Sequence, residues 1–421
     1  ERWRKWRRRR PHGVAVTGMM LAVLAAAGAV ALGAMVHVHQ RIELVRSALE
    51  DGPRQIASGR WDEAVATLRL GQAAARDIPL ERDLADALAH WLHRAEQGRD
   101  AAGRAAAARH LHALADRVRF LSGADRVPTG DLRGLEAPCR AFWQDRGRVV
   151  DRLRPAGASE LDPTVREDLL DLALFWADLQ GRMAPAPESE AARGQALTIL
   201  DQAEALLGPS PVLDRERIAR GAPGRAPEAP ARTAWEHVAL GRALLRAGEL
   251  ARAAAELDEA ARLQPQGLWP NFYQGLCAYR LGRYEDAIAA FSVCIGAAPE
   301  AAGCFYNRAR AFDAAGLAGP ALRDYDQALR LDPGLAAALL NRGVLHARAG
   351  RPDMARADLL RARDLGVDPA TVGLDLALVD LALGQRDAAL ADLRRVLADD
   401  PENPDARRLY DRLAKPGPGT R

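Results

Sequence analysis

The residues most able to do chemistry are four histidines that lie close together in the sequence. Imidazoles are common zinc ligands, so a zinc site is the first possibility. On a helix, residues three apart share a face, whereas residues two apart diverge by about 200°, so the four rings do not converge unless the fold brings them together. They are His90, His93, His110 and His112. We expect ordinary solvated histidines and predict no metal site.

Catalytic signatures are also missing from the sequence. It contains no H-E-x-x-H, no Gly-rich phosphate loop, no G-x-S-x-G, no C-x-x-C and neither of the kinase motifs H-R-D and D-F-G. Each of these motifs places a nucleophile, a base or a phosphate-binding backbone at a fixed spacing, and nothing in the chain substitutes for them. We therefore predict no catalytic residue and no cofactor within residues 1–421.

Two of the four cysteines, Cys294 and Cys304, are placed to meet each other. The first closes a predicted helix and the second opens the next one, so they are neighbours across a short turn. Outside the cytoplasm such a pair is able to form a disulfide. The alternative is that both are small buried hydrophobic side chains.

The helices that would position these groups follow a pattern that recurs every 34 residues, with units starting at Ala234, Leu268, Ala302, Ala336 and Ala370. The fifteenth position is always glycine, the cheapest residue for a left-handed helix end, and the twenty-fourth is always large and apolar. The eighth and twentieth positions are small in every unit, which permits close helix crossing. Examples are Gly241, Gly275, Ala309 and Gly343 at the eighth position, and Ala287 and Ala321 at the twentieth.

A period of 34 residues with these phased positions resembles the tetratricopeptide repeat. The resemblance implies stacked helical hairpins that form a superhelix with a concave groove. The expected fold class is all-α: an N-terminal transmembrane helix, an irregular helical middle domain and a C-terminal α-solenoid. The five repeats would cover 234–267, 268–301, 302–335, 336–369 and 370–403, followed by a capping helix and tail at 404–421.

In proteins of this family, the second, fifth, sixth, ninth and thirteenth positions of each first helix line the groove. The sixth position is Asn307 and Asn341 in consecutive repeats, and an amide there pairs with the backbone of an extended peptide. Arginines recur at the ninth or thirteenth position and would favour an acidic peptide or a free C-terminal carboxylate. They are Arg242, Arg246, Arg280, Arg310 and Arg348. The alternative is that they are solvated surface charges.

A membrane anchor is predicted near the N-terminus. Residues 1–13 form a basic juxtamembrane segment, and Val14 to Val36 carries no charge over 23 residues. A helix of that length measures roughly 34 Å, enough for a hydrocarbon core of about 30 Å. The alternative is a cleaved secretory signal. The positive-inside rule places the N-terminus in the cytoplasm and the repeats outside it, on the inner membrane of a bacterium.

Charge and small residues set the expectations for partners. Residues 1–10 carry seven Lys or Arg against Glu1, which leaves 52 basic and 55 acidic residues elsewhere, so we predict no nucleic-acid binding. Ala25, Ala29 and Gly33 lie on one side of the predicted span, and this side would let two copies approach closely. A homodimer is therefore one possibility, and the other is an ordinary Ala-rich span.

The middle of the chain, residues 37–218, has apolar residues at helical spacing without a clean period. A degenerate repeat-like hairpin is expected near 45–76, with Pro53 interrupting its first helix. Trp143 and Trp176 are expected to anchor the core. The Pro- and Gly-rich stretch 219–233 is predicted to be a linker into the repeats.

The order of these parts resembles the non-kinase portion of Planctomycetes-type bacterial transmembrane Ser/Thr protein kinases. The similar stretches are ERWRKWRRRRPHGVAV, HALADRVRFL, LLDLALFWADL and LDQAEALLGPSPVLDRER. The resemblance implies a cytoplasmic kinase domain before Glu1, so that residues 1–421 would be its sensing or scaffolding part. The alternative is a stand-alone membrane-tethered scaffold in envelope assembly with no catalytic domain. An in-frame kinase domain upstream of Glu1 would distinguish the two.

Overall fold

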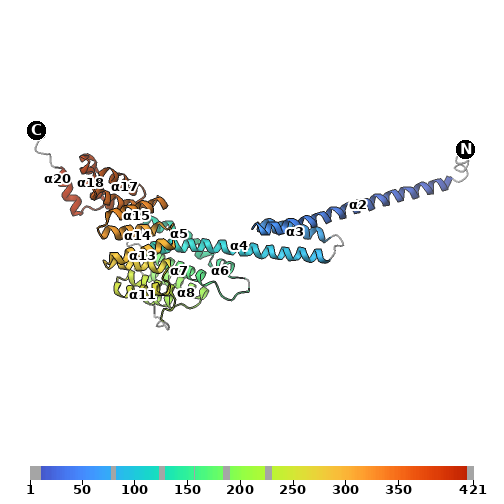
Figure 1. The fold of residues 1–421 in the computed structure, drawn as a ribbon, viewed down its shortest axis with the longest axis horizontal. Helices are drawn as coiled ribbons and strands as arrows, with labels where there is room; N and C mark the ends of the chain where they lie inside the picture. Colours follow the sequence, from blue (N-terminus) through green and yellow to red (C-terminus); the bar gives the residue numbers. More distant parts are fainter. Residues whose placement is uncertain are drawn as a thin grey trace. The chain divides into compact units, whose positions relative to one another are not determined.

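The computed structural model describes residues 11–76, 82–122, 129–155, 157–183, 190–222 and 230–414. Within these ranges every regular element is a helix, from α2 to α20 (Figure 1). The predicted all-α fold class is therefore confirmed. Residues 1–10 of the basic segment, and residues 415–421 of the predicted capping helix and tail, lie outside the described residues.

The chain divides into two compact units. The first comprises residues 1–109 and 152–155, and the second comprises residues 110–151 and 156–421. The predicted linker 219–233 lies within the second unit, and its role stays a prediction. Residues 223–229 of that linker are outside the described ranges.

The first unit is built on helix α2 (Pro11–Ala57), helix α3 (Trp61–Ala75) and the start of helix α4 (Arg82–Ser122). Its core joins Val45 and Ala48 of α2 to Leu68 of α3 and Leu88 of α4. The stretch from Val16 to Val36 is exposed. By length and composition, α2 is able to cross a membrane.

The predicted interruption at Pro53 is wrong, because α2 continues through this residue to Ala57. A proline removes one backbone donor and usually kinks a helix. Here the proline lies one turn from the end of the helix, and the preceding Gly52 is packed against Leu68, where an added Cβ would lie 2.7 Å from the Leu68 side chain. Packing of the hairpin therefore holds the last turn of α2 in place.

The second unit contains ten repeat helices in the predicted register. The first helices are α10 (Ala234–Arg246), α12 (Leu268–Arg280), α14 (Ala302–Ala314), α16 (Ala336–Arg348) and α18 (Pro369–Ala382). The second helices are α11 (Leu250–Leu263), α13 (Tyr284–Ala297), α15 (Ala318–Leu331), α17 (Pro352–Asp364) and α19 (Arg386–Asp399), and α20 (Pro404–Ala414) follows them. The glycine at the fifteenth position has a positive φ in every repeat, between 69° and 77°.

Close packing inside each hairpin depends on the small eighth position. An added Cβ at Gly241 would lie 2.5 Å from Leu257, and one at Gly275 would lie 2.8 Å from Phe291. The small residue therefore makes room for the large side chain at the twenty-fourth position. The alanines at the twentieth position, including Ala287 and Ala321, are fully buried.

The middle helices of the second unit are α5 (Thr129–Gln144), α6 (Arg146–Leu153), α7 (Pro163–Met183), α8 (Glu190–Leu207) and α9 (Pro211–Ala219). Leu153, the last residue of α6, is assigned to the first unit. In α7 the run from Asp168 to Ala177 is buried throughout. Trp143 and Trp176 are both buried, as the sequence predicts. The end of α4 from His110 onward also belongs to this unit, so the later middle helices and the repeats form one compact body.

Candidate functional site

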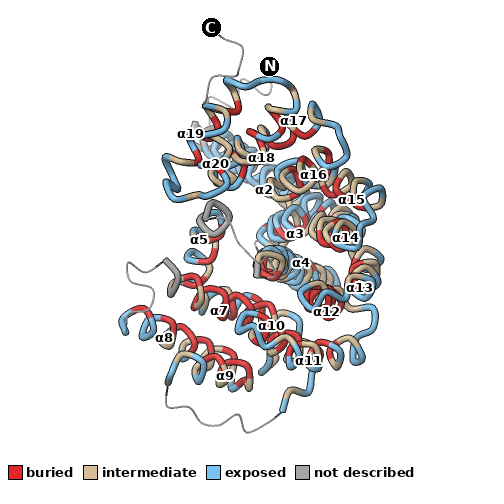
Figure 2. Tube along the Cα trace, turned by 90° about the vertical axis from the view of Figure 1, so that its left-hand side faces the viewer, coloured by how far each residue is buried: buried red, intermediate tan, exposed pale blue. Residues whose placement is uncertain are grey.

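By the resemblance to tetratricopeptide repeats, the concave face is expected at the second, fifth, sixth, ninth and thirteenth residues of the first helices. These residues are here called the groove positions. Figure 2 shows the end of α4 on the inner side of the arc made by α10, α12, α14 and α16. Contacts of α4 with α12 and α14 come from Arg119 and Phe120. The groove positions of the first repeats therefore face the chain's own helices.

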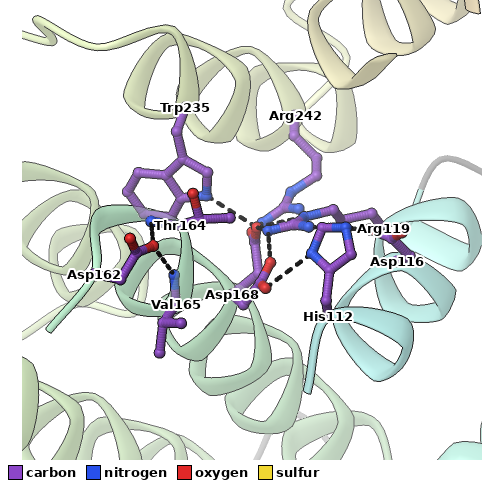
Figure 3. Close-up of polar contacts among 10 residues, drawn as sticks. His112, Asp116, Arg119, Asp162, Thr164, Val165, Asp168, Trp235 and Arg242 are labelled. Carbon is purple, nitrogen blue, oxygen red and sulfur yellow. Dashed lines mark hydrogen bonds and ion pairs between the residues drawn. The ribbon is translucent and has the colours of Figure 1, made fainter. Parts of the chain in front are cut away.

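A buried ionic cluster joins α4, α7 and α10. The Arg119 guanidinium lies 2.8 Å from Asp171 and 2.7 Å from Asp168, and the Arg242 guanidinium donates to the other oxygen of Asp171 at 2.6 Å. The indole nitrogen of Trp235 also donates to Asp171, at 2.9 Å. Figure 3 shows Arg119, Asp168 and Arg242 converging from the three helices. Each of the four charged residues is at most 4% exposed.

The two arginines and two aspartates compensate one another electrostatically. Burial alone would raise the pKa of Asp171, but the charges of Arg242 and Arg119 outweigh it and lower that pKa below its usual value. Burial likewise opposes the charge on Arg242, and the neighbouring Asp171 raises its pKa above the ordinary value. Each of the four charged residues thus has an opposite charge within hydrogen-bond distance, which offsets the cost of burying it.

Aromatic side chains continue the contact onto the second repeat. The ring of Phe120 packs edge-to-face against Trp269 and Phe272, with centroids 4.7 Å and 5.0 Å away. The hydroxyl of Tyr273 donates to the backbone carbonyl of Arg119 at 2.6 Å. Trp269, Phe272 and Tyr273 occupy the second, fifth and sixth positions of their repeat, so three groove positions contact two consecutive residues of α4.

Three of the arginines predicted to bind a ligand have partners within the chain. Arg242 binds Asp171, as described, and Arg246 donates to the buried Glu216 of α9 at 2.6 Å. Arg280 donates to the backbone carbonyl of Leu245 at 2.8 Å. Arg242 and Arg246 do pair with carboxylates, but these carboxylates belong to the middle helices of the same chain.

The predicted residues of the third and fourth repeats are differently engaged. Asn307 is 8% exposed; its amide nitrogen donates to the Gly303 carbonyl at 2.8 Å, and its amide oxygen accepts from Arg310 at 3.3 Å. The Arg310 guanidinium also lies over the ring of Tyr279, 4.5 Å from its centroid. Asn307 therefore uses both ends of its amide inside the fold, so a peptide would have to displace one of these bonds.

Groove positions of the fourth and fifth repeats are more accessible. Asn341 is half-buried and donates to the Tyr306 hydroxyl at 3.3 Å. The Arg348 side chain is 57% exposed and donates to both oxygens of Asp313 at 2.6 Å. In the fifth repeat Leu378 is 51% exposed, and burial raises the pKa of the half-buried Asp375. These groove positions therefore offer amide, guanidinium, carboxyl and apolar groups.

The histidines and cysteines are also placed by the structure. His112 lies 3.0 Å from Asp168, at the edge of the ionic cluster, and His93 bonds to Gln97 at 2.8 Å. Among the described residues no group of three or more possible ligands is arranged to hold a metal ion. Cys294 and Cys304 are buried thiols, and a hydrogen bond between them raises the pKa of Cys294 together with burial. Their disulfide stays a prediction.

Ionic pairs that join the two helices of one repeat were missed from the sequence. Arg308 forms a two-point pair with Asp324, and Arg342 does so with Asp358, at 2.7 to 2.9 Å. Arg342 also reaches back to Asp326 of the preceding repeat at 2.7 Å. The sequence does contain a signal for these pairs. Two consecutive repeats carry arginine at the seventh position and aspartate at the twenty-third. The buried aspartates of α7 had a signal too, because they interrupt an otherwise apolar run.

Comparison with known proteins supports the repeat assignment. The family model described as tetratricopeptide repeat matches residues 238–302, 306–366 and 374–410. A search of curated proteins finds no significant match.

Solved structures, among them two described as tetratricopeptide proteins, align with part of the chain. A thermophilic example from Thermus thermophilus is 24% identical over 43% of this chain and 99% of its own, with a TM-score of 0.36. YrrB, described as having an unusual peptide-binding site, is 19% identical over 42% of this chain and 91% of its own, with a TM-score of 0.37. PilF of Pseudomonas aeruginosa is 16% identical over 59% of this chain and 99% of its own, with a TM-score of 0.43.

The family match, the 34-residue register and the ten helices that follow it agree. The C-terminal part of this chain is a solenoid of tetratricopeptide repeats.

Proposed function

We propose that this protein is a membrane-anchored interaction module that holds a protein or peptide segment on the concave face of its fourth and fifth repeats. The observation that carries the proposal is the accessible set of groove positions there: Asn341 and Asp375 are half-buried, while Arg348 and Leu378 are exposed. The first two repeats, by contrast, direct their groove positions at the middle helices.

The chemistry of these positions suits an extended peptide. The amide of Asn341 pairs with a peptide unit whatever its side chain, because it offers both a donor and an acceptor. Arg348 would attract an acidic side chain or a C-terminal carboxylate, in competition with Asp313, and Arg310 would support it from the third repeat. Asp375 would accept from a backbone N–H, and Leu378 would cover an apolar side chain. Asn307 has the smaller part, since its amide already bonds within α14.

Anchoring is assigned to the exposed apolar stretch of α2, which is long enough to span a bilayer. In this proposal the N-terminus lies in the cytoplasm and the repeats lie outside it, at the inner membrane of a bacterium. The small residues Ala25, Ala29 and Gly33 would form the contact of a homodimer. The similarity to transmembrane Ser/Thr kinases suggests that the module reports a binding event to such a kinase; a stand-alone envelope scaffold is the alternative.

The test uses the full chain in detergent micelles and a library of fluorescent seven-residue peptides with free or amidated C-termini. For any peptide that binds, Asn341→Ala should weaken affinity about tenfold, the effect of losing a central contact. The same peptide with an amidated C-terminus should bind more weakly if Arg348 reads the carboxylate. Arg252→Ala, on the exposed side of α11, serves as the control and should leave affinity unchanged. Equal affinity of wild type and Asn341→Ala for every binding peptide would refute the assignment of this face.

A further inference from the structure

We propose that the end of α4 is an intrachain ligand of the first three repeats, and that their concave face recognises a helix in which arginine is followed by an aromatic residue. In this chain the pair is Arg119–Phe120. The peptide site above is centred on the fourth and fifth repeats, so the two proposals share only the third repeat and are tested separately.

The first argument is the position of the contacts. Trp269 and Phe272 hold the ring of Phe120, and Tyr273 binds the carbonyl of Arg119. Tyr273 stands at the sixth position, where the next two repeats carry asparagine. The side chain at the sixth position therefore already forms a hydrogen bond with a backbone group of another segment. By the resemblance to tetratricopeptide repeats, a residue at this position would bind the backbone of a peptide in the same way.

The second argument is the recognition of the arginine. Its guanidinium lies between the carboxylates of Asp168 and Asp171, 2.7 Å and 2.8 Å away, and 5.4 Å from the centroid of the Trp269 ring. Arg242, at the ninth position of the first repeat, holds the second oxygen of Asp171. A lysine would not reproduce this arrangement, because the planar fork both binds two carboxylates and stacks on an aromatic face.

The third argument is the fit of the aromatic ring. The second position of the third repeat is Gly303, whereas the first two repeats have tryptophan there. A Cβ at Gly303 would lie 2.9 Å from Cδ1 of Phe120. The missing side chain therefore provides the space that the ring of the ligand helix occupies.

A consequence is that the first three repeats bind an outside partner only when the end of α4 leaves them. The partner would be a helix with the same arginine-aromatic pair. The protein would therefore offer fewer repeats to a partner when the end of α4 is bound than when it is released.

The test adds this chain's own segment as a separate peptide. A fluorescent peptide of residues 106–122 is titrated into the full chain in detergent, either wild type or carrying Arg119→Ala and Phe120→Ala together. The double variant should bind the peptide, while the wild type, whose site is occupied, should bind it at least about tenfold more weakly. A matched peptide with both residues replaced by alanine should lose binding to the variant by at least about tenfold.

A double variant that keeps its helical circular dichroism and cooperative unfolding but does not bind the peptide would overturn the proposal. Equal binding of both peptides would also overturn it. Should the double variant fail to fold, Gly303→Leu provides a second test, because it fills the space of the Phe120 ring. It should speed hydrogen exchange of amides 110–122 at least about tenfold relative to Gly296→Leu, whose added Cβ would have no neighbour within 4 Å. Equal exchange in these two variants would contradict the proposal.

Discussion

At the scale of single residues, the most consequential feature is the group of charges buried between α4, α7 and α10. Such a group adds little stability when complete, because desolvation offsets the attraction between its members. Losing one member is different, since the remaining charges stay buried without compensation. The cluster therefore ties the middle helices to the repeats in one geometry and penalises alternatives.

Replacing Asp171 by asparagine should show this penalty. The change leaves the Arg119 and Arg242 guanidinium groups without the carboxylate they share, so unfolding free energy should fall by about 3–5 kcal/mol. Denaturant unfolding of the full chain in detergent measures the change. Asp201→Asn is the control: its side chain is 70% exposed and pairs with Arg217, so the expected change is below about 1 kcal/mol. A similar loss of unfolding free energy in Asp171→Asn and Asp201→Asn would contradict the proposed contribution of the cluster to stability.

The same region should give stability a characteristic pH dependence. The pKa of Asp171 is lower in the folded state than in the unfolded chain, so its stabilisation is present above about pH 4 and is lost as pH falls through the folded value. Burial raises the pKa of the neighbouring Glu167 from 4.5 to about 7, so this group lowers stability as pH rises between those values. Glu167→Gln should flatten the profile between pH 4.5 and 7. An unchanged slope there would show that Glu167 titrates normally.

At the scale of the helical hairpin, stability depends on the small residue opposite a large one. Gly275→Leu would place a side chain where a Cβ alone already approaches Phe291 to 2.8 Å, and overpacking of this kind should cost about 2 kcal/mol or more. The melting temperature of the full chain reports the loss. Gly296→Leu is the matched control, because this helical glycine is exposed and has no neighbour within 4 Å of an added Cβ. A melting temperature that is the same for Gly275→Leu and wild type would disprove the close crossing.

At the scale of the whole molecule, the proposed anchor determines whether the chain is attached to a membrane and on which side the repeats lie. The full chain should sediment with membranes, and deletion of residues 14–36 should move it to the soluble fraction. Protease added to spheroplasts should digest the repeats and spare an epitope tag placed before Glu1. Digestion of the tag with intact repeats would reverse the proposed orientation.

Much of the fold was accessible from the sequence because the repeats are quasi-periodic. Each unit presents the same small, glycine and large positions, so the register and helix ends follow from local rules. The groove was harder to predict. The likeness to other repeats indicates which positions face inward, but not that Asp171 and Glu216, distant in sequence, neutralise Arg242 and Arg246. Such pairings depend on how the irregular middle helices dock, for which the sequence has no period to follow.

The unbroken helix α2 has a mechanical consequence. Its last turns, with Val45 and Ala48, form the first half of the hairpin in the first unit, and its apolar stretch is the proposed anchor. Because a helix turns about 100° per residue, inserting one alanine between Val38 and Arg41 would swing the hairpin about 100° around the axis of the anchor, and inserting seven would restore its azimuth to within about 20°. A rotation of the anchor about its axis in the bilayer would be transmitted to the hairpin, because both belong to one continuous helix.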